Sequence, residues 1–156
     1  MSERQEKMRA LVGEWAGTKK LWMMPGSPAE ECESTASVAL EACGQFATVR
    51  YTWSGEGQAR EGLFVVRLAT TPTKADVVWT DSWHMKDEFM VCPAEKDDDA
   101  IISVKGSYPA PPGPDWGWRM AIRSDAPDTF QVVMHNITPD GQEALAVEAT
   151  YDRAPK

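Results

Sequence analysis

The sequence WGWRMAIR at residues 116–123 shows the pattern that decides the fold. In an extended strand, Trp116, Trp118, Met120 and Ile122 share one face, and the small or charged residues between them share the other. An apolar alternation of period two is typical of a strand with one face toward a core. We therefore expect a strand over residues 115–123 with its two tryptophans pointing inward.

Similar runs lie on both sides of this strand, with turn signals between them at even spacing. Together they predict ten strands, at about residues 14–24, 32–40, 45–53, 58–69, 75–83, 88–92, 100–107, 115–123, 129–137 and 142–151. The connections PGSP (25–28), SGEG (54–57) and TPDG (138–141) contain residues that turns prefer. Helical periodicity is confined to about residues 2–12, where Ser2 can cap a short helix.

Ten short antiparallel strands in one sheet tend to curl and close, because closure removes the exposed edges. A length of 156 residues suits one core, and neither a linker nor a repeat divides the chain. We expect an all-β fold, with residues 1–156 forming a single antiparallel barrel of about ten strands that the helix covers at one end. Barrels of this size tend to hold a ligand.

Charge and cysteine content narrow the class of protein. The net charge of −8, with no cluster of Lys and Arg, argues against nucleic acid and an anionic membrane surface as partners. The charged start of the chain lacks the apolar stretch of a signal peptide. The three cysteines have no CxxC spacing, which argues against a disulfide framework and a structural zinc site. We expect a cytoplasmic protein with no metal and no other cofactor.

Seven tryptophans and eight methionines are the unusual feature of the composition. Such side chains either fill a large, irregular core or line an apolar pocket for a flat ligand. Alternation places Trp79, Asp81 and Trp83 on one face of the strand over residues 75–83, with His84 on the other. In the strand over residues 129–137, alternation with apolar neighbours points His135 inward.

Asp81 is a carboxylate on an apolar face, where it needs hydrogen-bond donors or stays protonated. It is either a structural acceptor for Trp N–H groups, a Tyr hydroxyl or an arginine, or an acid/base group. We favour the structural role. Arg119 is a further polar candidate, although alternation places it outside. The expected ligand-binding residues are Trp79, Asp81, Trp83, Trp116, Trp118, Met120, Met134 and His135.

Several segments, taken in their order, resemble the domain-of-unknown-function family DUF1579. They are LVGEWAG (11–17), PGSP (25–28), VWTDS (78–82), WGWR (116–119) and the ending from PDG (139–141) to YDR (151–153). The resemblance implies a calycin-like, lipocalin-like barrel and no settled activity. The opening GEWAG (13–17) is also similar to nitrobindin-type haem barrels, which use a histidine late in the chain; His135 lies in about that region.

These observations predict a barrel that binds a small, mostly apolar or aromatic molecule in its interior. Three alternatives stay open: a haem protein with His135 or His84 as axial ligand, a small isomerase- or cyclase-like enzyme with Asp81 and a histidine as acid and base, and a structural or dimerisation module whose tryptophans are only core. We expect neither histidine to bind a metal, because nothing around them specifies supporting hydrogen bonds. Whether the chain catalyses a reaction or forms a homodimer is left open.

Overall fold

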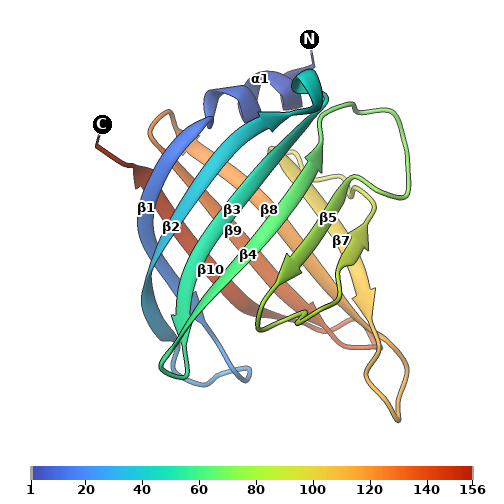
Figure 1. Cartoon of the computed structure of the whole chain (residues 1–156). Coiled ribbons are helices and arrows are strands. Elements are labelled where there is room, and N and C mark those ends of the chain that lie inside the picture. The colour runs from blue at the N-terminus through green and yellow to red at the C-terminus, as the bar shows by residue number, and fades with distance from the viewer. Residues whose placement is uncertain (1, 156) are drawn as a thin grey trace.

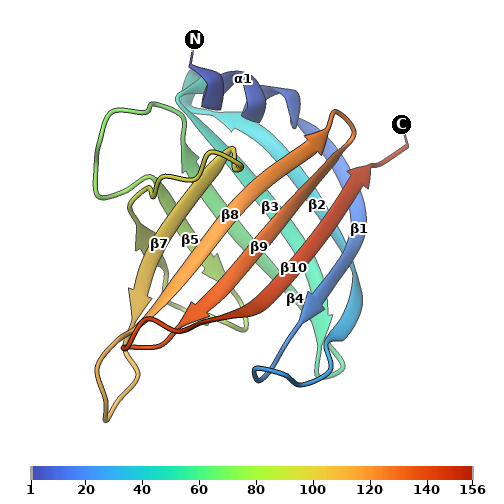
Figure 2. The ribbon, with the colours of Figure 1, turned by 180° about the vertical axis from the view of Figure 1, so that it is seen from behind.

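The computed structural model describes residues 2–155 and shows one antiparallel sheet curled into a nearly closed barrel (Figures 1 and 2). All ten expected strands are present, with ends that differ by a few residues from those expected. The elements in chain order are α1 Glu3–Ala10, β1 Gly13–Leu21, β2 Glu30–Glu41, the 3₁₀ helix η1 Ala42–Gly44, β3 Phe46–Gly55, β4 Gln58–Arg67, β5 Val77–Asp81, β6 Met90–Cys92, β7 Ile102–Tyr108, β8 Trp116–Ala126, β9 Thr129–Ile137 and β10 Glu143–Arg153.

The strand order β6-β5-β4-β3-β2-β1-β10-β9-β8-β7 leaves β6 and β7 as the two ends of the sheet. A single antiparallel bridge, between Ala94 and Val104, joins the segments at this seam. The close approach depends on Gly106 of β7, because a Cβ atom there would collide with the side chains of Met90 and Cys92 of β6. The barrel therefore closes along only part of its height.

Helix α1 covers one end of the barrel, as expected (Figure 1). The side chain of Ser2 accepts from the backbone N–H of Gln5, whose side chain accepts from Ser2 in return, and this reciprocal cap starts the helix. Met8 is fully buried, and Leu11 accepts a 2.8 Å hydrogen bond from Trp15 Nε1 of β1. No helix between residues 2 and 155 is long and apolar enough to cross a membrane.

A buried ion pair attaches the helix to the barrel wall. Asp76, only 3% exposed, lies before β5 and faces Arg4 of α1 at 3.2 Å and Arg67 of β4 at 3.5 Å. Its second oxygen accepts the backbone N–H of Ala94 at 3.1 Å. One carboxylate thus connects the helix, the end of β4 and the segment that follows β6.

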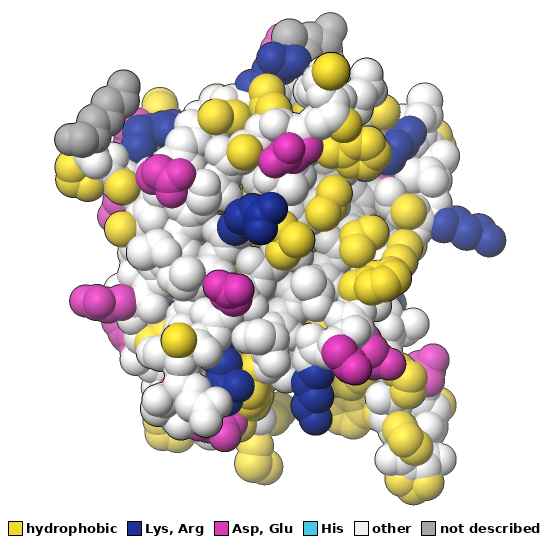
Figure 3. All heavy atoms as spheres, in the orientation of Figure 1, with side chains coloured by type: hydrophobic (Ala, Val, Ile, Leu, Met, Phe, Trp, Pro, Cys, Tyr) yellow, Lys and Arg dark blue, Asp and Glu magenta, His cyan; other side chains and the backbone are white. Residues whose placement is uncertain are grey.

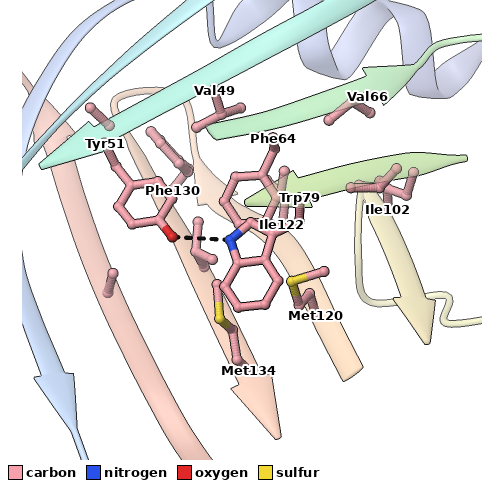
Figure 4. Close-up of a cluster of buried hydrophobic side chains, with 14 of the residues drawn as sticks. Val49, Tyr51, Phe64, Val66, Trp79, Ile102, Met120, Ile122, Phe130 and Met134 are labelled. Atoms are coloured by element: carbon pink, nitrogen blue, oxygen red, sulfur yellow. Dashed lines mark hydrogen bonds between the residues drawn. The ribbon is translucent and has the colours of Figure 1, made fainter. Parts of the chain in front are cut away.

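Large side chains fill the barrel interior (Figure 4). The hollow that remains among Lys19, Tyr51, Met134 and their neighbours has a volume of only about 10 Å³. In this region the large side chains act as core, and the hollow that lies there is too small to hold the expected ligand. The labelled core side chains are Val49, Tyr51, Phe64, Val66, Trp79, Ile102, Met120, Ile122, Phe130 and Met134.

We predict that Asp76→Ala lowers the free energy of unfolding by about 3 kcal/mol or more, because it leaves two guanidinium groups without their buried partner. Chemical denaturation followed by circular dichroism measures the change. The control is Asp128→Ala: the Asp128 side chain is 81% exposed in its pair with Arg153, and its loss should cost less than about 1 kcal/mol. Equal effects of the two substitutions would contradict the prediction.

Candidate functional site

A cleft of about 730 Å³ lies at the incompletely closed seam, toward the end opposite α1. We call it the Trp118 cleft. The turn between β5 and β6 forms one side, and β7 with the start of the β7–β8 connection forms the other. Its lining residues are Trp79, His84, Met85, Lys86, Asp87, Glu88, Phe89, Met90, Ser107, Tyr108, Pro109 and Trp118.

Two stacked indoles form the inner wall of the Trp118 cleft. The rings of Trp79 and Trp118 lie 5.8 Å apart and within 7° of parallel. The imidazole of His84 packs beside both, 5.7 Å from Trp79 and 5.5 Å from Trp118. Neither His84 Nε2 nor Trp118 Nε1 has a hydrogen-bond partner among residues 2–155, although both atoms are buried. The wall therefore combines flat apolar surface with two unsatisfied polar atoms.

Asp81 explains why His84 lies on this wall. Strand β5 ends at Asp81, whose carboxylate accepts the backbone N–H groups of Trp83 at 2.9 Å and His84 at 3.0 Å. The backbone N–H groups of Met85 and Lys86 then donate to the Asp81 carbonyl. The expectation that the strand continues to residue 83, with His84 on the outer face, is therefore wrong. The Asp81 turn ends the alternation and folds His84 back against the indoles.

The other carboxylate oxygen of Asp81 is held from inside the barrel. Oδ2 accepts from the Tyr51 hydroxyl at 2.6 Å and from Trp53 Nε1 at 3.1 Å. Asp81 is completely buried, and both of its oxygens have two donors. The expected Trp N–H and Tyr hydroxyl donors are thus present. Burial opposes ionisation of Asp81, but the nearby His84 and these hydrogen bonds outweigh it and lower the pKa of Asp81.

Tyr51 links this carboxylate to the stacked indoles. Its hydroxyl accepts a 3.0 Å hydrogen bond from Trp79 Nε1, which Figure 4 shows, and donates to Asp81, so the hydrogen bonds run from Trp79 through Tyr51 to the carboxylate. Gly62 of β4 leaves room for the tyrosine ring, since a Cβ atom there would overlap it. Burial and the negative Asp81 raise the pKa of Tyr51 well above its ordinary value. Tyr51 therefore remains a neutral donor.

Lys19 of β1 is a buried cation beside the same group. Its ammonium lies 3.3 Å from the centroid of the Trp53 ring, on the face of the indole whose N–H donates to Asp81. Burial lowers the pKa of Lys19 to about 8, against the attraction of Asp81. Lys19 is not among the expected site residues. The sequence does indicate its inward direction, because Lys19 is two residues from Leu21 and four from Trp15, and both of these face inward.

The remaining expected ligand-binding residues lie elsewhere. Met120 and Met134 are paired across β8 and β9 inside the packed core (Figure 4). Trp83 is half-buried, and its Nε1 donates to Glu56 at 2.9 Å. Trp116 is half-buried at the start of β8 and does not line the Trp118 cleft. Of the eight expected residues, Trp79 and Trp118 line this cleft.

His135 does not face the interior, so that expectation is wrong. Because its neighbour Met134 points into the core, alternation turns His135 outward, opposite Arg119 in the β8–β9 register. Arg119 itself lies outside, as alternation predicted, where it pairs with Glu95 and Glu143. Burial, followed by the charges of Arg119 and Arg123, lowers the pKa of His135.

Comparison with known proteins identifies a family and a shared fold. The model of the family described as "Protein of unknown function (DUF1579)" matches residues 2–153. The structure of Rv2717c from M. tuberculosis superposes with a TM-score of 0.61 at 14% identity and covers 99% of each chain, which shows a similar fold. The S-type phycobiliprotein lyase CPES from Guillardia theta gives a TM-score of 0.47 at 15% identity, over 97% of this chain and 93% of that one. No curated protein matches the sequence.

We predict that Asp81→Ala lowers the free energy of unfolding by about 3 kcal/mol or more, because it orphans four donors in or beside the core. Asp81→Asn should cost less, since one oxygen remains as an acceptor. Thermal and urea unfolding measure both. Asp87→Ala, an exposed position on the same turn, should change the free energy of unfolding by less than about 0.5 kcal/mol. An Asp81→Ala protein as stable as the parent would refute the structural role.

We predict that the protein loses stability as the pH falls from 6.5 to about 4. Burial lowers the pKa of His84 from 6.5 to about 4, so within this window the unfolded chain binds a proton that the folded chain does not. His84→Gln should flatten this part of the stability profile, measured by urea unfolding at each pH. His135→Gln, on the outer face, should leave most of the dependence in place; the opposite pattern would contradict the assignment.

Proposed function

This chain belongs to the DUF1579 family of proteins of unknown function, and we propose that it binds a small, flat, mostly apolar molecule in the Trp118 cleft. The observation that carries this proposal is the inner wall, where stacked indoles adjoin two buried nitrogens without partners. A buried polar atom without a hydrogen bond costs about 1–3 kcal/mol. A ligand that supplies the missing bond while it covers the rings would recover that cost.

The two orphaned nitrogens indicate which polar group the ligand carries. Trp118 Nε1 is only a donor, so it requires an acceptor such as a carbonyl oxygen or a ring nitrogen. His84 has a pKa of about 4 because it is buried, so at neutral pH its imidazole is uncharged and offers no cation to an anionic ligand. The wall thus favours an uncharged aromatic molecule with one or two acceptors.

The rim of the Trp118 cleft carries both apolar and charged side chains, which suits a mostly apolar ligand. Phe89 is 66% exposed on the turn that borders the cleft, and it would become covered by a bound molecule. Lys86 lies beside Asp87 and Glu88, so both signs of charge occur at the rim. On the face seen in Figure 3, basic and acidic side chains are likewise dispersed and form no continuous basic patch.

The side chains do not fit a haem. His135 lies on the outer face of the barrel, so it does not reach the cleft. His84 lines the cleft, but its imidazole is packed against the rings of Trp83 and Trp118, and no hydrogen bond within residues 2–155 orients it as an axial ligand would be oriented. An enzyme that uses Asp81 as acid or base is also not favoured, because Asp81 is fully buried and does not line the cleft. Ligand binding is the function that this geometry supports best.

We predict that the neutral fluorescent probe N-phenyl-1-naphthylamine binds the protein and that Trp118→Ala weakens its affinity by about tenfold, the effect of losing one aromatic contact of about 1.4 kcal/mol. Fluorescence titration measures the dissociation constant. Trp116→Ala is the matched control, since Trp116 lies on the same strand but outside the cleft. Equal losses in the two variants, or no binding to the parent, would overturn the proposal. A haem-type Soret band that appears with added haemin and disappears in His84→Ala would favour the haem alternative instead.

A further inference from the structure

Lys19 is a second polar feature, and the proposed function does not use it. The residue is only 2% exposed and lies on β1 between Cys32 of β2 and Ala149 of β10 in the strand register. Its ammonium contacts the Trp53 ring, with Tyr51 next nearest at 5.8 Å from Nζ to the ring centroid. Among residues 2–155, no hydrogen bond or ion pair engages this amine.

Such an arrangement is costly for a cation. A buried charge is normally paired, as Asp76 is with two arginines, because removal from water is otherwise too expensive. Lys19 has only the face of an indole, and the nearest carboxylate inside the barrel, Asp81, is already held by four donors. Burial therefore lowers the pKa of Lys19 to about 8, so a much larger share of this amine is neutral at pH 7 than in an exposed lysine, although the ammonium is still the main form. The titratable groups around Lys19 inside the barrel are Asp81, His84, Cys32, Tyr51 and Tyr151.

Lys19 also lines a hollow at the surface of the barrel. This hollow is a cleft of about 160 Å³ between the ends of β1 and β2 and the β3–β4 hairpin. These segments lie at the end of the barrel opposite α1 (Figure 1). We call the hollow the Lys19 cleft. Three carboxylates, those of Glu30, Glu31 and Glu56, line the same cleft. They repel anions, so a molecule that reaches Lys19 by this route is small and is not negatively charged.

We propose that the ε-amine of Lys19 is a covalent anchoring site for small neutral aldehydes or ketones that enter through the Lys19 cleft. The amine nitrogen attacks the carbonyl carbon, the carbon–oxygen π bond breaks, and a proton passes from nitrogen to oxygen to give a carbinolamine. Loss of this hydroxyl and a second proton from nitrogen as water then forms the imine. No oxidant or reductant is required, and the reaction is reversible by addition of water. This site is separate from the Trp118 cleft and goes beyond the proposed function.

The experiment uses propanal with sodium cyanoborohydride, which reduces the imine to a stable secondary amine, on the full chain at pH 7. Peptide mass spectrometry then measures the initial labelling rate at each lysine. At this pH an amine of pKa about 8 has about two hundredfold more neutral form than an ordinary lysine. Even with slower access, Lys19 should be labelled at least about tenfold faster than Lys20, its half-buried neighbour, which alternation turns to the outer face. The labelling rate of Lys19 should level off above pH 8, where most of its amine is already neutral.

Variants separate this proposal from a general effect on folding. Lys19→Met keeps the apolar stem, should retain the barrel spectrum in circular dichroism and should abolish the fast label. It should also leave binding of N-phenyl-1-naphthylamine unchanged, while Trp118→Ala should leave labelling of Lys19 unchanged. Labelling of Lys19 no faster than that of Lys20 would overturn the proposal. Faster labelling by the anionic aldehyde glyoxylate than by propanal would overturn the assignment to neutral carbonyl compounds.

Discussion

The carboxylate of Asp81 is the constraint on which the open end of the barrel depends. One oxygen holds the backbone of the turn that follows β5, and the other holds Tyr51 and Trp53 on β3. Because these two groups of donors come from different parts of the chain, the Asp81 carboxylate connects the turn to the core. The position of His84, the stack of Trp79 on Trp118 and the inner wall of the Trp118 cleft all follow from that connection.

The location of the cleft follows from how the sheet closes. A ten-stranded sheet in which β6 has three residues cannot pair along its full height with β7, which has seven. At one end the seam is held by Gly106 and by the Asp76 ion pair, which also attaches α1. At the other end the turn after Asp81 lies across the gap without strand pairing. The unpaired part of the seam is therefore where a hollow remains, whereas the middle of the barrel is filled.

Much of the fold could be predicted from period-two alternation, because burial of one face requires it. The ten strands, the inward direction of Tyr51, Trp53, Trp79 and Asp81, and the donors to Asp81 all follow from it. Alternation does not predict the position of His84. The strand ends at Asp81, because the Asp81 carboxylate accepts the backbone N–H groups of Trp83 and His84, and the period of two ends with it. The inward direction expected for His135 is wrong because its neighbours on the outer face of β9, such as Val133, are also apolar and buried. Apolar residues therefore occur on both faces of this strand, and they do not identify the inner one.

The size of the interior could not be predicted either, because strand count does not determine how much volume the enclosed side chains occupy.

The buried polar atoms differ in whether this chain satisfies them. Asp76 and Asp81, the two buried carboxylates between residues 2 and 155, have both oxygens hydrogen-bonded by donors of this chain. The buried side-chain atoms without a partner among residues 2–155 are nitrogens and a hydroxyl. Trp118 Nε1 can only donate, so it needs an acceptor from water or from a ligand, whereas a neutral imidazole nitrogen or a hydroxyl can donate or accept. In the Trp118 cleft, the proposed acceptor is carried by an aromatic ring that also stacks on the indoles. In the Lys19 cleft, the proposed ligand is a carbonyl compound whose carbon the amine nitrogen attacks. The ligands proposed for the two clefts are accordingly uncharged, carbonyl-bearing or heteroaromatic molecules, and the net charge of −8 disfavours anions.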